Sequence, residues 1–416
     1  MNMNTNITVN LTPEIRLEQA LKEAGVENPA SIISLTITGT MEKEDLTYIK
    51  KNMTKTLKEL DMGDASIKQK TFPRTAFSKK NVLVTLTLPK SVGFYTTTLL
   101  DCNNLESVKV HSDCAYFTSQ DGALFNKNKT KLIRYFNKES DYIIPNSVIE
   151  ICNFAFWNCL ELNSVEIPNS VKEIGHCAFK YCSSLKNIII PDSVVEIGVE
   201  AFAYCENLTS VVLSNSITSI GSSMFYGCAF TSIDIPDSVT EIDDAFRNCS
   251  KLMSITLPNS IKKLCVPDLD AIFIPESVTE IAPTYRTSGR YGDAYFDIHP
   301  DNTMYASEKG VLFNKNKTKL MSCPKTMQGE YTVPNSVIEI EEGAFRSCKE
   351  LTSITIPDSV VKIGNWTFPS NGSSIYIPKS VIEIKNWDLF TDTDVFTVHS
   401  GNPFYTSENG KLKEKK

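Results

Sequence analysis

The chain has 416 residues, of which 41% are hydrophobic and 22% are charged, a composition typical of a folded globular protein. Its net charge of −7 argues against nucleic acids and anionic membranes as partners, because their binding needs lysine and arginine concentrated on one face. No apolar run approaches the roughly 20 residues of a membrane-spanning helix, and the first residues lack the basic and apolar segments of a secretory signal. We therefore expect no membrane span, and a protein that is either intracellular or given without its leader.

Residues 1–80 predict a terminal segment with helices and strands of its own. Thr12-Pro13-Glu14 is typical of a helix start, and Gly25 is a stop signal. The apolar face of this helix is formed by Leu17, Leu21 and Ala24. Apolar residues at strand spacing predict two early strands: Ile32, Leu35 and Ile37, then Leu57, Leu60 and Met62. A helix between these strands would carry Leu46, Ile49 and Met53.

From residue 81 to residue 416 a short phrase returns at a fixed period. It begins as Ile144-Pro145-Asn146-Ser147-Val148, and its prolines at 145, 168 and 191 are 23 residues apart. Further copies surround Pro89, Leu213, Pro236, Pro258, Pro275, Pro334, Pro357 and Pro378. Because a fixed period of this length is the signature of stacked repeats, the sequence predicts an α/β repeat solenoid rather than compact domains.

One coil of this solenoid can be followed from Leu185 to Cys205. Its inward strand positions have the L-x-x-L-x-L spacing of Leu185, Ile188 and Ile190. Gly198 is expected to permit a tight bend. One-turn spacing of Ala201, Phe202 and Cys205 then predicts a short helix or 3₁₀ turn on the opposite face.

The phrase I/L-P-x-S-V-x-x-I-G-x-x-A-F-x-x-C-x-x-L-x-S-I resembles the BspA-like, or Treponema pallidum-type, leucine-rich-repeat surface proteins, most clearly over 145–260 and 334–378. The resemblance implies a right-handed superhelix with one parallel β-sheet face, short helical or 3₁₀ turns on the other face, and residues 1–80 as the N-terminal cap. It also implies a non-enzymatic protein of the cell surface that binds a protein or glycan partner in adhesion. The alternative is an intracellular protein–protein interaction scaffold, favoured by the missing signal sequence.

A second motif is nested in the repeats. The segment from Tyr116 to Leu132 returns from Tyr305 to Leu320, and its polar stretch Asn126–Lys131 lies between apolar flanks. We therefore expect β-hairpin inserts near 116–136 and 305–324, with a truncated third copy at 405–416. The lysine-bearing hairpin tips are read as solvated turns in preference to glycan contacts, because they lack interleaved aromatic residues.

Most of the cysteines and histidines, which are catalytic or metal-binding residues in other proteins, recur here at equivalent positions of the repeats. Seven cysteines share one repeat position, Cys102, Cys159, Cys182, Cys205, Cys228, Cys249 and Cys348, without the paired C-x₂-C spacing of a zinc site. We expect them to form a buried column of reduced thiols. Three of the four histidines precede the hairpin motif, and His176 has no nucleophile motif to serve. We therefore predict no enzyme activity, metal or cofactor.

The outward strand positions are the candidate binding surface. The variable column consists of Lys109, Glu166, Ile189, Val212, Asp234, Thr256, Phe273, Thr355 and Tyr376. After Ile281 the repeat breaks into a loop with Tyr285, Arg286, Arg290 and Tyr291. We hypothesise a recognition patch of Phe273 with these loop residues, a second apolar area at Ile189 and Val212, and an exposed aromatic at Tyr376. The alternative is a decayed repeat whose loop covers Phe273.

Overall fold

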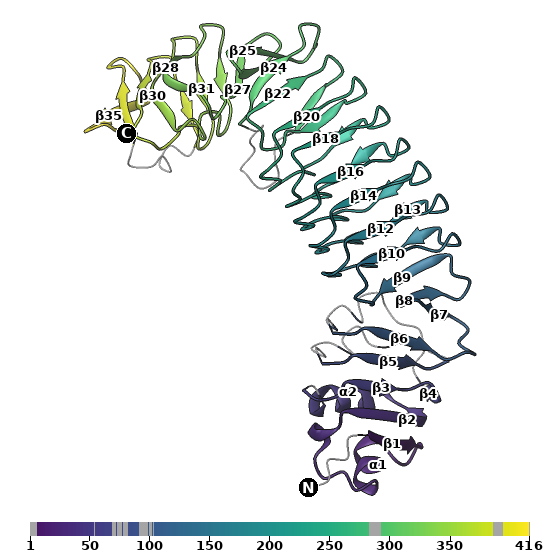
Figure 1. Ribbon diagram of the computed structural model, residues 1–416. Coiled ribbons are helices and arrows are strands. Elements are labelled where there is room, and N and C mark those ends of the chain that lie inside the picture. The colour runs from purple at the N-terminus through teal and green to yellow at the C-terminus, as the bar shows by residue number, and fades with distance from the viewer. Residues whose placement is uncertain are drawn as a thin grey trace. The chain divides into compact units, whose positions relative to one another are not determined.

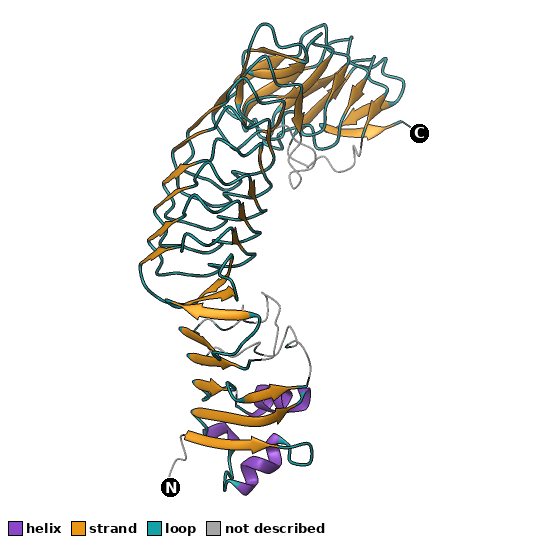
Figure 2. Ribbon diagram, turned by 90° about the vertical axis from the view of Figure 1, so that its right-hand side faces the viewer, coloured by secondary structure: helices purple, strands orange, loops and turns teal. Residues whose placement is uncertain are grey.

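The computed structural model describes residues 6–53, 55–68, 72, 77, 82–90, 99, 102, 104–282, 293–385 and 394–415. It divides into two compact units, one formed by the chain up to residue 216 together with 224–228, the other by 217–223 and 229–416. Stacked parallel strands make up most of each unit (Figure 1). The two α-helices of the described residues lie in the N-terminal part of the chain (Figure 2).

The first unit begins with a six-stranded sheet covered by two helices. Its strands are β1 (Asn6–Leu11), β2 (Ser34–Met41), β3 (Glu59–Asp61), β4 (Ala65–Ile67), β5 (Thr85–Leu88) and β6 (Ser107–Val110), all paired in parallel. The helices are α1 (Leu17–Glu23) and α2 (Lys43–Asn52), with a 3₁₀ turn, η1 (Pro29–Ser31), between α1 and β2. The strands and helices predicted for this segment are present, except that α1 starts after Thr12, whose hydroxyl accepts a hydrogen bond from the Ile15 amide.

Two strands, β1 and β4, and one buried charge of this segment were not predicted. The alternation of buried Ile7, Val9 and Leu11 along β1 is a strand pattern that opens the sheet. Asp45 is 1% exposed and accepts hydrogen bonds from the amides of Glu42 and Leu17, at 2.8 and 2.9 Å, besides pairing with Arg16. A buried carboxylate with three donors joins the starts of both helices.

The repeats of the first unit stack through two parallel ladders. The L-x-x-L-x-L strands form two parallel pairs in successive coils, β10 (Asp141–Ile143) with β12 (Ser164–Glu166) and β14 (Asn187–Ile189) with β16 (Ser210–Val212), and we call this series the first ladder. The second ladder follows the Ser-Val phrase and contains β9 (Lys131–Tyr135), β11 (Glu150–Ile151), β13 (Glu173–Ile174) and β15 (Glu196–Ile197). Between them the phenyl rings of Phe156, Phe179, Phe202 and Phe225 stack at centroid distances of 4.7, 5.2 and 5.6 Å.

The A-F-x-x-C segment is a chain of turns in the coils between residues 145 and 260, and the helical or 3₁₀ segment expected there is absent from these coils. Cys177 and Tyr181 have φ of +53° and +66°, which a right-handed helix does not allow. Their amides, with that of Phe179, donate to carbonyl oxygens of the next coil at 3.0, 3.0 and 2.7 Å. The segment therefore forms a third line of hydrogen bonds between coils, and the one-turn apolar spacing was compatible with both conformations.

Gly198 serves a close approach of two coils, which corrects the bend expected from the sequence. Its φ is outside the left-handed region, but a Cβ there would lie 2.4 Å from the His176 amide nitrogen in the preceding coil. Gly175 and Gly364 are in the same situation, with backbone atoms at 2.6 and 2.4 Å from a built Cβ. The glycine of the repeat sets how closely the coils stack.

The second unit repeats both ladders. Its L-x-x-L-x-L strands are β18 (Ser232–Asp234), β20 (Ser254–Thr256), β22 (Ala271–Ile274), β24 (Tyr295–Ile298), β28 (Gln328–Thr332), β30 (Glu350–Thr355), β32 (Ser374–Ile377) and β34 (Val395–Val398). The second ladder contains β17 (Ser219–Ile220), β19 (Glu241–Ile242), β21 (Lys263–Cys265), β23 (Glu280–Ala282), β27 (Lys319–Ser322), β29 (Glu339–Ile340), β31 (Lys362–Ile363) and β33 (Glu383–Ile384). The solenoid of stacked parallel strands predicted from the repeats is confirmed.

The hairpin inserts are confirmed as antiparallel strands that continue into the second ladder. They are β7 (Phe117–Gln120) with β8 (Ala123–Asn126), β25 (Tyr305–Glu308) with β26 (Val311–Asn314), and β35 (Tyr405–Glu408) with β36 (Lys411–Glu414). In the first two copies a third strand, β9 or β27, pairs antiparallel on one side and parallel with the next coil on the other. The pairing also makes Phe117, and not Tyr116, the equivalent of Tyr305, so the motif alignment made on the sequence was wrong by one residue.

Candidate binding surface

The cysteine column is buried over most of its length. Cys182, Cys205, Cys228, Cys249 and Cys348 are buried, and Cys159 is partly exposed. The thiols of Cys182 and Cys205 donate to the carbonyl oxygens of Phe156 and Phe179, at 3.1 and 3.2 Å. Burial raises the pKa of Cys205 to about 12, so its thiol is protonated at neutral pH. The buried thiols of the column therefore act as small core residues.

Each of the four histidine side chains accepts a hydrogen bond from a backbone amide. His176 Nδ1 accepts a hydrogen bond from the Val199 amide of the next coil at 2.9 Å. His111, His299 and His399 each accept one from the amide two residues later, that of Asp113, Asp301 or Gly401, at 3.1, 3.2 and 2.9 Å. The same contact in three copies accounts for the recurrence of histidine before each hairpin.

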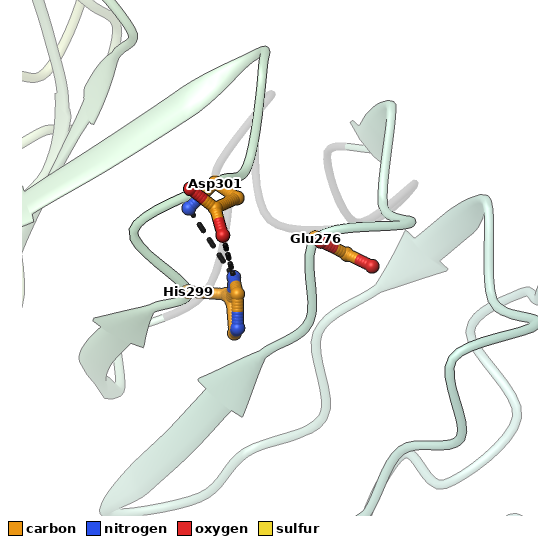
Figure 3. A group of neighbouring side chains, drawn as sticks. All are labelled: Glu276, His299 and Asp301. Atoms are coloured by element: carbon orange, nitrogen blue, oxygen red, sulfur yellow. Dashed lines mark hydrogen bonds and ion pairs between the residues drawn. The ribbon is translucent and has the colours of Figure 1, made fainter.

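One group of side chains has the composition of a metal site. Ligand atoms of Glu276, His299 and Asp301 lie within 4.8 Å of one another, from the turns after β22 and β24 (Figure 3). Both carboxylates are exposed, and His299 Nδ1 is used by the turn. The third copy of the turn has Gly401 where the second has Asp301. We therefore assign this group to the turn and place no metal there.

The lysines of the hairpin tips are engaged locally. Lys127 and Lys315 donate to the carbonyl oxygens of Ser112 and Pro300, and Lys317 pairs with Glu308 at 2.6 Å. The remaining tip lysines pair with side chains of their own hairpin or of the next coil: Lys129 with Gln120, Lys131 with Glu150, and Lys319 with Glu339 and Glu341. These contacts support the interpretation of the tips as turns.

In the first unit, outward positions of the strand ladder carry exposed aliphatic side chains. Ile189 and Val212 are 65% and 54% exposed and are register partners on β14 and β16. Ile143, on β10, is 70% exposed and is the register partner of Glu166. Ile143 was missed in the sequence, although it stands two residues before Pro145 as Ile189 stands two residues before Pro191. We call Ile143, Ile189 and Val212, with Glu166 between them, the aliphatic column.

In the second unit, exposed aromatic side chains lie on the corresponding strands. Phe273 is 47% exposed on β22, with its ring edge-on to His299 at 6.2 Å, and Tyr295 is 44% exposed on the neighbouring β24. Tyr376 is partly exposed on β32. The loop residues that were expected beside Phe273, Tyr285, Arg286, Arg290 and Tyr291, lie outside the described residues.

The same architecture is known in other proteins. The family profile described as "BspA type Leucine rich repeat region (6 copies)" matches residues 31–142, 134–253, 218–284 and 322–405, which is most of the chain. The chain belongs to the BspA-type leucine-rich-repeat family. Membership agrees with the turn, strand and cysteine positions described above and confirms the resemblance noted in the sequence. No curated protein matches this BspA-type chain.

Solved structures of bacterial leucine-rich-repeat proteins resemble this BspA-type chain. A leucine-rich cell surface protein of Faecalibacterium prausnitzii is 28% identical, with a TM-score of 0.53, over 69% of this chain and 80% of that one. The Treponema pallidum leucine-rich-repeat protein is 29% identical over 38% of this chain and 77% of that one, with a TM-score of 0.32. Within the described residues, no helix is long and apolar enough to cross a bilayer.

Proposed function

We propose that this BspA-type chain is a non-enzymatic binding protein of the cell surface that attaches to another protein through its aliphatic column. The observation that carries the proposal is the exposure of Ile189 and Val212, which are register partners on β14 and β16, together with that of Ile143 on β10 in an earlier coil. Exposed aliphatic side chains that adjoin on a rigid sheet are typical of a contact surface, because removing their apolar area from water is favourable.

A protein is favoured over a glycan as the partner. Isoleucine and valine side chains have no hydrogen-bonding groups for sugar hydroxyls and no ring for stacking on a sugar face. Glu166, exposed between Ile143 and Ile189, adds one negative charge at the centre of the column. The column therefore fits a protein surface with apolar side chains around a lysine or arginine.

The proposed location rests on the likeness to the Faecalibacterium protein, which is described as a cell surface protein. Antibody labelling of intact and permeabilised cells of the producing organism tests it. Labelling of intact cells is expected. Labelling only after permeabilisation would favour the alternative of an intracellular scaffold.

Binding is tested with the full chain on an array of purified matrix proteins and glycans. The double variant Ile189→Asp with Val212→Asp is expected to weaken binding to a protein probe more than tenfold, because it places two charges in the contact. Val195→Asp is the matched control, since Val195 is 58% exposed in the same unit but outside the column. Equal binding by the double variant and the wild type, or binding to glycans alone, would contradict the proposal.

A further inference from the structure

Cys159 differs from the cysteines that follow it in the column because of the coil that precedes it. That coil ends in β9 and the residues after it, and has no A-F-x-x-C turn. Tyr135 occupies the start of the missing turn, and its amide donates to the Ala155 carbonyl oxygen at 2.8 Å. Cys159 is therefore partly exposed, whereas Cys182 and Cys205 in the next coils are buried.

A cavity of about 340 Å³ occupies the place of the missing turn. Its lining includes Arg134, Tyr135, Trp157 and Cys159. Arg134 is 8% exposed, and its guanidinium donates hydrogen bonds to the carbonyl oxygens of Phe154 and Trp157. Arg134 Nε and the Tyr135 hydroxyl have no partner among the described residues. A buried positive charge and a thiol thus line one cavity.

The surroundings of Cys159 lower the pKa of its thiol. The neighbouring Cys182 side chain has the largest effect and lowers the pKa of Cys159, burial opposes this, and the positive charge of Arg134 lowers the pKa further. Cys177 is the other partly exposed cysteine in the described structure, and its surroundings raise the pKa of its thiol. Burial and the Glu200 carboxylate, 3.5 Å from its Sγ, raise the pKa of Cys177 to about 11.

The equivalent position in the second unit lacks this arrangement. Cys348 also follows a hairpin insert, but it is fully buried, and its thiol donates to the carbonyl oxygens of Cys323 and Pro324. Strand pairing places Ser322 where Arg134 stands in the first unit. The two inserts therefore provide an internal comparison of the same repeat position with and without the arginine.

We propose that Cys159 is a modification site that forms a mixed disulfide with small disulfides bearing a carboxylate, the attached group lying in the cavity beside Arg134. The Cys159 thiolate attacks one sulfur of the small disulfide, and that sulfur–sulfur bond breaks. The other half leaves with the electron pair as a thiolate and takes a proton from water. Cys159 is oxidised to the disulfide level, and one half of the reagent is reduced to a thiol.

The other charges at the cavity leave Arg134 as the group that selects an anion. Lys138 lines the cavity but pairs with Glu106 at 2.6 Å, and Glu161 is exposed. In a site of reduced dielectric constant, a buried arginine attracts a carboxylate and repels an ammonium group. A carboxylate-bearing disulfide should therefore react faster than a disulfide of similar size that bears amines.

The reduced full chain is incubated separately with 3,3′-dithiodipropionate and with cystamine, and the modified cysteines are identified by peptide mass spectrometry over time. Dithiodipropionate is expected to modify Cys159 on the order of ten times faster than cystamine does. It should modify Cys159 before Cys177 and leave Cys348 unmodified. Equal rates for the two reagents, or faster reaction of Cys177 or Cys348, would overturn the proposal without any variant.

Two variants assign the effect to the arginine. Arg134→Lys keeps the positive charge and should keep the preference for dithiodipropionate, whereas Arg134→Met should abolish it and slow the reaction about tenfold. Circular dichroism establishes that each variant is folded. A folded Arg134→Met protein with the preference of the wild type would show that Arg134 does not select the reagent.

Discussion

In the second and third hairpins, a tyrosine hydroxyl accepts a hydrogen bond from the backbone of a preceding coil. The side-chain oxygens of Tyr305 and Tyr405 each accept a hydrogen bond at 2.8 Å from a buried amide in the second ladder, that of Ile281 or Ile384. The equivalent residue of the first hairpin is Phe117, which has no hydroxyl. A one-residue difference in spacing hid this equivalence in the sequence, because Tyr116 and Phe117 are adjacent aromatic residues.

Tyr305→Phe is predicted to destabilise the second unit by about 1–3 kcal/mol, because it leaves the buried Ile281 amide without an acceptor. Hydrogen–deuterium exchange at Ile281 should become faster, and the midpoint of urea unfolding should fall. Tyr295→Phe is the control, since Tyr295 is 44% exposed and lies on the adjacent strand. An unchanged exchange rate at Ile281 would mean that the hydroxyl contributes nothing to this amide.

At the scale of the element, the L-x-x-L-x-L strands were predictable, whereas the short strands of the second ladder and the turns between strands were not. Alternation of apolar residues fixes which side of a strand is buried, so Ile188 and Ile190 were placed correctly in the core. The spacing of Ala201, Phe202 and Cys205 fits one helical turn but also fits turns with left-handed residues at Glu200 and Tyr204. Three apolar positions are too few to separate these conformations, since neighbouring coils decide the hydrogen bonding.

Gly198→Ala is predicted to lower the free energy of unfolding by about 1–3 kcal/mol or more, because the added Cβ would overlap the His176 backbone and force coils apart. Cys152→Ala is the matched control. Cys152 occupies the same repeat position in the first coil after an insert and already has a Cβ. Urea unfolding of both variants tests the difference. If Gly198→Ala is as stable as the wild type, the close approach does not limit stacking.

The buried cysteines of the column are predicted to react slowly with alkylating reagents in the folded protein. Native protein at pH 8 should label slowly with iodoacetamide at Cys182 and Cys205 and rapidly after unfolding in urea, because their thiols are buried and protonated. Mass spectrometry of the labelled peptides gives the rates. Rapid labelling of either residue in the folded protein would contradict their assignment to the core.

At the scale of the whole molecule, burial of weak acids makes stability fall at high pH. The pKa values of Cys152, Cys205 and Cys265 are raised by burial from 9.0 to about 12, and that of Tyr135 from 10.0 to about 12. Since the folded values are higher, the stabilisation is fully present below pH 9. It is lost as the pH rises through about 12, because the unfolded chain releases these protons first.

The free energy of unfolding, measured in urea at several pH values, should therefore be level from pH 7 to about pH 8.5 and fall steadily to pH 11. Cys205→Ala should reduce the slope, whatever its effect on stability at pH 7, because it removes one of the titrating groups. A flat dependence up to pH 11 would show that the buried groups do not titrate differently on unfolding.

The whole solenoid was predictable from the period of the repeat, and the candidate site only in part. Ile189 and Val212 were found because the ladder alternates, and their exposure agrees with the outward positions assigned to them. The cavity beside Cys159 could not be predicted, since it arises where an insert omits a turn and Arg134 reaches across to the next coil. Such a contact has no periodic signature in a sequence.

The hairpin that continues into a ladder has a consequence for how such chains change over generations. In the first two inserts the last strand pairs antiparallel with its own hairpin and parallel with the next coil, so both start a new ladder with the same strand pairing. Recombination within the DNA that encodes a hairpin would join two arrays of coils and keep the strand pairing between the hairpin and the coil that follows it. The natural cassette for gain and loss is therefore the run of coils between two hairpins, and related chains should differ in length by whole cassettes.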